Sequence, residues 1–280
     1  MRRRLSASTI LALALLLGVA VLVAVVPMLP GYDPFAQDLA SGLLPPGGES
    51  FDGRVYLLGT DTLGRDVLSR LALAGRISLF IGFSAVLLSL VIGVFLGLLA
   101  GFFRGWIENV VMGVADLQLS IPRVLLLIAI GAIIGTGVVN LAVLLGITSW
   151  VVYGRVARAM ALSLREREFV LSATTQGATA AWNIRKHLLP NVLPQMLIVG
   201  SYELGQIIVL EASLSYLGLG VQPPMPSWGL MVSEGQTYLE LDPWLSVLPS
   251  IALFMLVAGV QILSQSFTAE NDMSAEIVKA

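Results

Sequence analysis

Six long apolar segments constrain the fold of this chain more than any other feature. Only 12% of its 280 residues are charged, about half the usual share of a soluble domain. About 20 apolar residues suffice for a helix to cross the hydrocarbon core of a bilayer. The sequence therefore predicts an all-α integral membrane protein with six transmembrane helices. These cover residues 10–26, 77–103, 110–134, 141–159, 194–214 and 244–263.

The first apolar segment follows a basic start, Arg2 to Arg4. A cleavable secretory signal peptide begins in the same way. However, the segment is long, no clear small-x-small cleavage site follows it, and more apolar segments come later. A retained first helix is therefore the favoured interpretation.

The distribution of Lys and Arg predicts the orientation. Most of the 16 basic residues fall on the side that holds the N-terminus, which indicates the cytoplasmic side. Both termini are then cytoplasmic (N-in, C-in), and residues 31–76 and 218–242 form outer loops.

We expect the chain to divide into three parts. Residues 1–76 hold the first helix, an outer loop and a short amphipathic helix; residues 77–268 form a transmembrane core with a cytoplasmic loop at 160–193; residues 269–280 are a cytoplasmic tail.

The short amphipathic helix is expected within residues 61–76. Asp61 or Thr62 can cap it, and one face of it holds Leu63, Val67, Leu68 and Leu71. Such a helix would lie at the membrane surface. In contrast, residues 31–55 and 218–242 are rich in Gly and Pro, which indicates extended loops.

Three glycines recur every fourth residue in the second apolar segment, at Gly93, Gly97 and Gly101. In lipid, this spacing lets two helix backbones approach closely. The alternative is the ordinary glycine content of membrane helices.

Arg155 and Arg158 lie at the end of the fourth apolar segment, and four more charged residues fall inside the apolar segments. Such residues usually face protein or water rather than lipid. Asp116 and Arg123 are two turns apart, too far to pair on one helix. Glu203 could face a water-filled cavity or pair with another helix. Glu211, near an outer end, is expected to be structural.

No motif of an active site is present. The sequence lacks a Walker loop, HExxH and GxSxG. With no cysteine and one histidine, a thiolate site or a His cluster for a metal is excluded. A net charge of −2 gives no nucleic-acid footprint. We therefore expect a protein that is not an enzyme, with no cofactor of its own.

A polar island, residues 165–194, interrupts the apolar pattern and holds the single histidine, His187. Residues 166–176 and 180–189 have helical patterns, with Phe169, Val170 and Ala173 on one side of the first, and Gly177 permits a turn between them. We expect two short helices, the second ended by Pro190, that form a compact knob able to transmit force to the helices on either side. The alternative is a solvated loop that obeys the positive-inside rule.

The island resembles the cytoplasmic coupling (EAA) loop of permease subunits in bacterial ABC importers. That pattern is Glu-Ala-Ala, three residues, Gly, nine residues, then Ile-x-Leu-Pro. Leu171, Ser172 and Ala173 stand at its start, with Leu171 in place of the acid that helps to dock the ATPase; Glu166 and Glu168 are nearby. The residues that the resemblance implies for ATPase coupling are Glu168, Leu171, Ser172, Ala173, Gly177, Ala178, His187, Leu189 and Pro190.

Residues 57–79 and 211–235 are similar to two stretches of the dipeptide/oligopeptide/nickel permease family, and suggest its C-type subunit. With the island, the resemblance covers about residues 10–268. It implies a type I ABC importer in the bacterial cytoplasmic (inner) membrane. The implied partners are a second permease subunit, two ATPases that bind ATP and Mg²⁺, an extracytoplasmic solute-binding protein, and membrane lipid. ATP binding would switch the cavity between the two permeases from inward to outward facing.

The expected function is ATP-driven import of peptides or similar small solutes, with Glu203 as a possible residue of the path. Dipeptides, longer peptides, nickel chelates and glutathione all remain open as the solute. Two other classes remain: a stand-alone channel or scaffold that needs no ATPase, and a membrane enzyme, which would require a buried catalytic pair.

Overall fold

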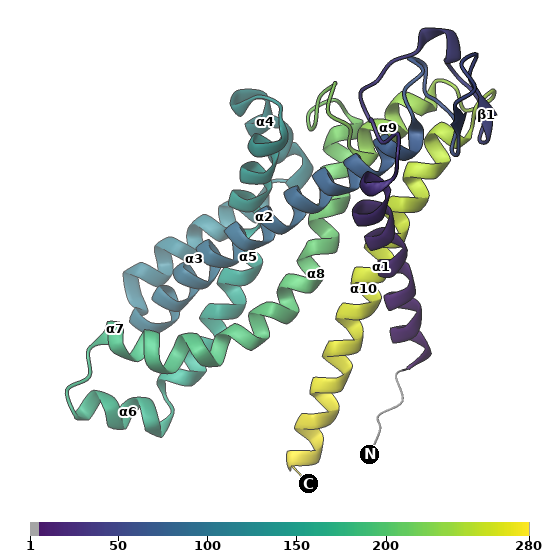
Figure 1. Cartoon of the computed structure of the whole chain (residues 1–280). Helices are drawn as coiled ribbons and strands as arrows, with labels where there is room; N and C mark the ends of the chain where they lie inside the picture. Colours follow the sequence, from purple (N-terminus) through teal and green to yellow (C-terminus); the bar gives the residue numbers. More distant parts are fainter. Residues whose placement is uncertain (1–5, 280) are drawn as a thin grey trace.

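The computed structural model describes the backbone of residues 6–279 and the side chains of residues 6–266. Long helices lie side by side (Figure 1). A loop-rich cap, which we define as residues 29–66 and 218–242, lies at one end of them, and two short helices lie at the other (Figure 1). The predicted tail, residues 269–280, lies outside the described side chains. The helices are α1 Ala7–Val25, α2 Val67–Phe103, α3 Gly105–Ser120, α4 Arg123–Ile134, α5 Val138–Arg165, α6 Glu168–Thr175, α7 Ala180–Asn183, α8 Leu189–Tyr216, α9 Trp228–Gln236 and α10 Trp244–Lys279.

Shorter elements complete the described chain. Two 3₁₀ turns, η1 Val26–Met28 and η2 Leu39–Ser41, flank the start of the cap. Strands β1 Gly48–Glu49 and β2 Val55–Tyr56 pair antiparallel as a small hairpin within it. A π-helical turn, η3 Ile184–Leu188, joins α7 to α8.

Five of the described helical segments are long and apolar enough to cross a membrane. They are Ala7–Met28, Val67–Phe103, Val138–Arg165, Ala180–Tyr216 and Trp244–Ser266. Helices α3 and α4 together form a sixth span if the pair is counted as one. The structure therefore confirms the all-α membrane architecture expected from the sequence.

The third span is broken rather than continuous. Helices α3 and α4 meet at an angle of 97° across residues 121–122. Pro122 has no backbone N–H and disfavours a helical conformation in the residue before it, so α3 ends at Ser120. The prediction of a single helix over residues 110–134 is wrong for this reason.

The predicted surface helix at residues 61–76 is also wrong. Helix α2 begins at Val67 and runs without interruption to Phe103. The Asp66 carboxylate caps it by accepting hydrogen bonds from the backbone N–H groups of Leu68 and Ser69, at 3.3 and 3.0 Å. Asp61 instead stabilises the preceding turn, where it accepts the backbone N–H of Arg65 at 3.0 Å. The segment thus extends the second span instead of lying on the membrane.

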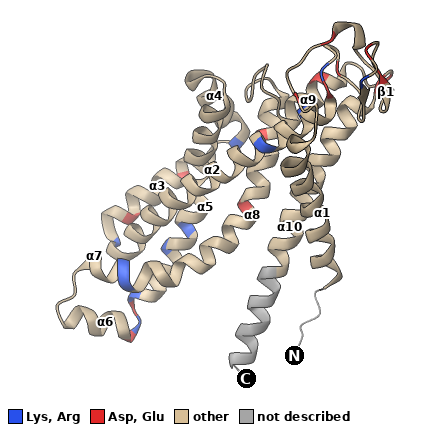
Figure 2. Cartoon of the chain, viewed as in Figure 1, with Lys and Arg blue, Asp and Glu red and all other residues tan. Residues whose placement is uncertain are grey.

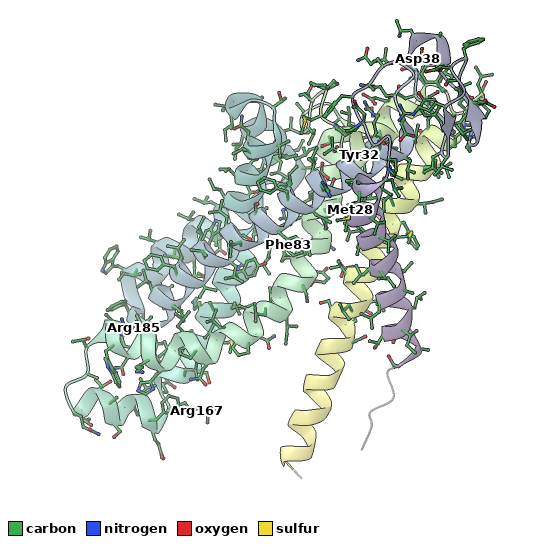
Figure 3. The ribbon with its side chains drawn as sticks, in the orientation of Figure 1. Met28, Tyr32, Asp38, Phe83, Arg167 and Arg185 are labelled. Atoms are coloured by element: carbon green, nitrogen blue, oxygen red, sulfur yellow. The ribbon has the colours of Figure 1, made fainter. Side chains whose placement is uncertain are left out.

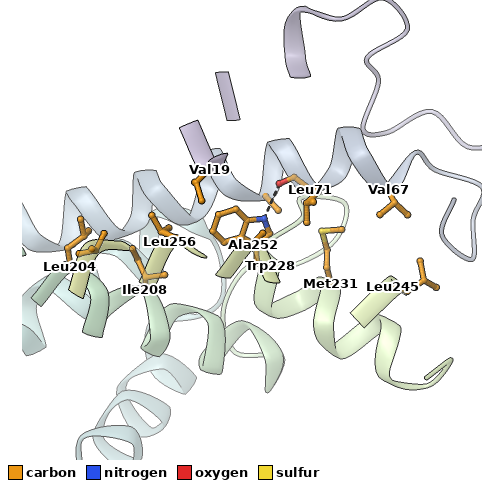
Figure 4. Close-up of a cluster of buried hydrophobic side chains, with 12 residues drawn as sticks. Val19, Val67, Leu71, Leu204, Ile208, Trp228, Met231, Leu245, Ala252 and Leu256 are labelled. Atoms are coloured by element: carbon orange, nitrogen blue, oxygen red, sulfur yellow. Dashed lines mark hydrogen bonds between the residues drawn. The ribbon is translucent and has the colours of Figure 1, made fainter. Parts of the chain in front are cut away.

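The cap is fixed to the helices by a buried tryptophan. Trp228, at the start of α9, is fully buried and its indole N–H donates to the Leu71 carbonyl of α2 at 3.0 Å (Figure 4). Met231 and Val19 pack in the same cluster (Figure 4). Residues 218–242, predicted as a loop, therefore contain a short helix whose aromatic start belongs to the core.

Ion pairs reinforce the cap. The fully buried Arg70 guanidinium lies 3.3 Å from the Asp61 carboxylate and 3.0 Å from that of Glu234. This links the turn before α2 to α9. Charged residues gather in the cap and at the α6–α7 end, and those along the helices between the two ends are more widely spaced (Figure 2). That distribution fits a protein whose middle lies in lipid.

Helices α2 and α5 are in backbone contact along the glycine stripe. A Cβ atom at Gly93 would lie 2.5 Å from the Trp150 carbonyl oxygen, and one at Gly97 would lie 2.4 Å from that of Gly154. At Gly101, the Arg158 carbonyl oxygen would be 2.7 Å away. No side chain fits at these distances, so the close approach predicted from the spacing is confirmed.

We expect Gly97→Leu to separate α2 from α5, because the new side chain meets backbone atoms that cannot move independently. Overpacking of this kind lowers the free energy of unfolding by about 1–3 kcal/mol. Thermal unfolding in detergent measures it. Gly113→Leu in α3 is the matched control, since a Cβ there has no heavy atom within 4 Å. Equal melting temperatures for the two variants would contradict the packing argument.

Candidate functional site

The polar island lies at the end of the molecule farthest from the cap, where α6 and α7 project beyond the long helices (Figure 1). We call residues 166–188, which comprise α6, α7 and η3, the knob. It follows α5 directly and leads into α8. The island is therefore a compact structured element, as predicted, and not an extended loop.

Local sequence explains how the knob folds. Glu168 occupies the first turn of α6, where the helix dipole favours an acid. The helix ends before Gly177, whose φ of +90° suits glycine and few other residues. Thr179 then caps α7 by accepting the Trp182 N–H at 3.3 Å. The chain thus reverses direction at the predicted glycine.

The second helix of the knob does not end at Pro190. The π-helical turn η3 carries the chain from α7 into α8, and residues 180–216 form one helical segment. Pro190 falls in the first turn of α8, where its missing N–H is tolerated. The predicted break is therefore wrong, and the knob is continuous with a membrane-spanning helix.

A hydrogen bond and a cluster of three rings hold the knob together. The Asn183 side chain is 1% exposed, and its Nδ2 donates to the Thr174 hydroxyl of α6 at 3.0 Å. The His187 ring stands edge-on to two aromatic rings, with centroids 5.3 Å from Phe169 and 4.9 Å from Trp182. Such edge-to-face geometry is favourable. His187 thus packs against the aromatic rings of the knob.

The knob is seated on the long helices by apolar side chains. Val170 and Leu188 are buried in a cluster with Leu98 of α2, Ala161 of α5 and Met196 of α8. Arg165, just before the knob, donates from Nη1 to the Phe102 carbonyl of α2 at 2.6 Å. A force on the knob therefore reaches α2, α5 and α8 through direct contacts.

The residues expected from the coupling-loop resemblance all lie in or next to the knob. Glu168, Leu171, Ser172, Gly177 and Pro190 are exposed. Ala173, Ala178, His187 and Leu189 are half-buried. Glu168 and Leu171 are three residues apart on α6, which places them on neighbouring turns of one face. Glu168 can therefore present a carboxylate close to the position where the family pattern has its acid.

Sequence reasoning missed part of the knob surface. Phe169 and Val170 were expected on one side, yet Val170 is buried and Phe169 is 44% exposed. Trp182, which was not singled out, is also 44% exposed, and Leu171 is 52% exposed. Arg167 and Arg185, which are two and three positions from Phe169 and Trp182 in the sequence, are exposed as well and are labelled in Figure 3. Exposed apolar groups with a polar rim are typical of a protein-binding surface.

The charged residues inside the spans pair between helices. Asp116 of α3 pairs with Arg155 of α5 at 2.5 Å, and not with Arg123. Glu203 of α8 is buried and lies 3.9 Å from Arg123 of α4, which is the helix-pairing alternative considered for it. Glu211 accepts hydrogen bonds from two buried serines, Ser78 at 2.8 Å and Ser215 at 2.9 Å, as a structural acid would. Among the described residues, no group of three or more His, Asp or Glu could hold a metal ion.

We expect Thr174→Ala to loosen α6, because the buried Asn183 amide then has no partner. An unpaired buried polar group costs about 1–3 kcal/mol. Hydrogen exchange of the α6 amides should accelerate about tenfold, as that free energy implies. Thr175→Ala is the matched control, since the exposed Thr175 hydroxyl donates only to Ser172 of the same helix. Equal exchange in both variants would show that the Thr174–Asn183 bond does not hold the knob.

Comparison with known proteins identifies the family. Residues 93–269 match the family model described as "Binding-protein-dependent transport system inner membrane component". The glutathione transport system permease protein GsiD of Pectobacterium atrosepticum is 38% identical over 208 residues, which cover 74% of this chain and 69% of that protein. The nickel transport system permease protein NikC of Escherichia coli K12 is 34% identical over 241 residues, or 86% and 85% of the two chains.

The fold agrees with this assignment. A chain of the MetNI methionine ABC transporter, solved in an inward-facing conformation, superposes with a TM-score of 0.56 at 20% identity. The match covers 72% of this chain and 95% of that one. The chain belongs to the binding-protein-dependent transport system inner membrane components: it is a multi-pass, non-catalytic permease subunit of an ABC importer of the peptide, nickel and glutathione family.

Proposed function

We propose that this chain forms half of the translocation path of an ATP-driven importer for peptides or similar small solutes. A second, different permease subunit forms the other half. The observation that carries the proposal is the knob, which is packed onto α2, α5 and α8 and exposes the side chains of Phe169, Leu171 and Trp182. Relatives named for dipeptides, di- and tripeptides, glutathione and nickel support this solute class.

In this proposal the ATPases act on the permease through the knob. Two partner ATPases bind ATP and Mg²⁺, and their closure pushes on α6 and α7. Val170 and Leu188 carry that push to the long helices, and η3 carries it along the backbone into α8. Alternation between inward-facing and outward-facing arrangements requires two packed states of the same helices.

Glu168 supplies the acid of the docking surface. Leu171 occupies the position of the family's glutamate, and its neutral, half-exposed side chain cannot accept a charge-assisted hydrogen bond. Glu168 is exposed on the preceding turn of the same face. Phe169, Leu171 and Trp182 provide the apolar contact area around it. The remaining residues of the coupling motif, from Ser172 to Pro190, shape the knob.

The chain divides into three functional parts under this proposal. Residues 1–66 hold the first helix and most of the cap. We place the cap on the outer side of the membrane, where this part of it and residues 218–242 together receive the solute-binding protein. The core boundary expected at residue 76 falls inside α2, so we place the start of the core at Val67. The core extends to residue 268, followed by the cytoplasmic tail, residues 269–280.

Single cysteines will report the orientation, because the chain has none of its own. We expect Phe51→Cys in the cap, where the native side chain is 93% exposed, to react with a membrane-impermeant maleimide on intact spheroplasts. Thr175→Cys in the knob should react only after the membrane is opened. The reverse pattern would place the knob outside and remove its role in ATPase coupling.

Charge exchange will test the docking role of Glu168. We expect Glu168→Gln to weaken ATPase binding to the nanodisc-embedded permease pair about tenfold, the loss of roughly one charged interfacial hydrogen bond. Adding Leu171→Glu should restore binding, because the acid returns on the same face. Glu240→Gln, on the exposed cap side, is the control. Unchanged binding in Glu168→Gln, or solute flux through this chain without any ATPase, would overturn the proposal.

A further inference from the structure

A second polar site lies deep among the helices, where α4, α5 and α8 meet. The guanidinium of Arg123, the first residue of α4, donates from Nη2 to the Ser149 hydroxyl of α5 at 2.6 Å. The same nitrogen lies 3.9 Å from Oε2 of Glu203 on α8. Three residues far apart in sequence thus converge on one point.

Two helices independently place this site near the middle of the membrane. Ser149 is 11 residues from the start of α5, or about 17 Å along its axis. Glu203 is 13 residues from the end of α8, or about 20 Å. Both distances run from the end of the molecule that holds the cap. Since the hydrocarbon core is about 30 Å thick, the site lies well inside it.

The groups at the site have unused hydrogen-bonding capacity. Glu203 is 3% exposed, and its Oε2 has no hydrogen-bond partner among the described residues. Nε of Arg123 is likewise buried and without a partner there. At 3.9 Å the two charges attract but do not share a hydrogen bond. The site is therefore polar, preformed and incompletely satisfied.

Arg123 is open on one side, whereas Glu203 is enclosed. The Arg123 side chain is 34% exposed and that of Glu203 is 4% exposed. A charged group in contact with lipid at this depth is costly, so the open side of Arg123 faces water or protein. Arg123 also sits at the 97° break of the third span. Irregular backbone at membrane depth is tolerated where it lines a cavity or is buried in protein.

We propose that Arg123 lines the translocation path and binds the carboxylate group of a passing solute, with Ser149 and Glu203 as positioning residues. The proposal deepens the function given above and rests on it. Guanidinium is suited to a carboxylate because its planar donors match the two oxygens. Peptides with a free C-terminus carry that group. The Glu203 carboxylate competes with the solute carboxylate for the Arg123 guanidinium. This competition keeps the affinity of Arg123 for the solute low enough for the solute to leave.

The first experiment measures whether Arg123 acts on a water-filled path. Ser120→Cys, at an exposed position three residues away and so within about 11 Å along the chain, serves as the reporter. The assembled transporter in proteoliposomes is treated with a sulfonate-bearing or a trimethylammonium-bearing methanethiosulfonate. We expect Arg123→Gln to lower the ratio of the anionic to the cationic labelling rate about tenfold. Glu203→Gln should raise it.

The matched control is Arg76→Gln, which makes the same change on an exposed arginine at the contact between α2 and α1. It should leave the labelling ratio unchanged. A ratio that does not respond to Arg123→Gln would overturn the proposal. So would a reporter that neither reagent reaches with or without ATP, since the open side of Arg123 would then be covered by the second permease subunit.

The second experiment tests the solute class with trialanine and trialanine amide as probes. We expect Arg123→Gln to lower ATP-driven uptake of the acid about tenfold, as loss of a charge-assisted pair implies, and to spare the amide. Arg123→Lys should recover part of the uptake. Equal loss for both peptides would assign Arg123 a purely structural role and overturn the proposal. If the unsubstituted transporter takes up neither peptide, the proposed solute class fails, and the labelling ratio alone decides whether Arg123 is exposed to the path.

Discussion

The contact between the α2 and α5 backbones is the constraint on which the rest of the structure depends. Gly93, Gly97 and Gly101 remove the side chains that would hold the two helices apart. In lipid the hydrophobic effect does not drive helices together. Van der Waals contacts between closely packed helices provide the attraction instead. The paired helices then form a platform. The knob is seated at one end of it, and α8 lies along its side.

Much of the fold could be predicted because lipid restricts the choices. A spanning segment must satisfy its own backbone hydrogen bonds, so apolar runs of sufficient length become helices. The spacing of Gly93, Gly97 and Gly101 also predicted that α2 would approach another helix closely. In contrast, the ends of helices depend on single hydrogen bonds. Asp61 was expected to cap the helix, but its carboxylate pairs with Arg65 and Arg70 in the preceding turn, and Asp66 caps α2 instead.

The knob was predictable in position but not in its connection to the membrane. Gly177 marks the turn and Pro190 suggests a break, and the structure uses only the first signal. A search of the sequence for apolar residues with a period of 3.6 cannot reveal the π-helical turn before Pro190. Such a turn changes the register of the backbone hydrogen bonds without changing the amino-acid composition. The pairing of Arg123 with Glu203 was likewise hidden, since the two residues are 80 positions apart and meet only through the bend at Pro122.

The unbroken course from α7 through η3 into α8 has a mechanical consequence. Its 37 residues make a helical segment about 55 Å long, which follows a bent path from the knob toward the cap (Figure 1). If its knob end tilts as a rigid body, each degree of tilt displaces the far end by at most about 1 Å, the value for a straight helix of this length. A few degrees of rocking are therefore enough to move its distal residues by the width of a side chain, without unfolding or sliding any helix.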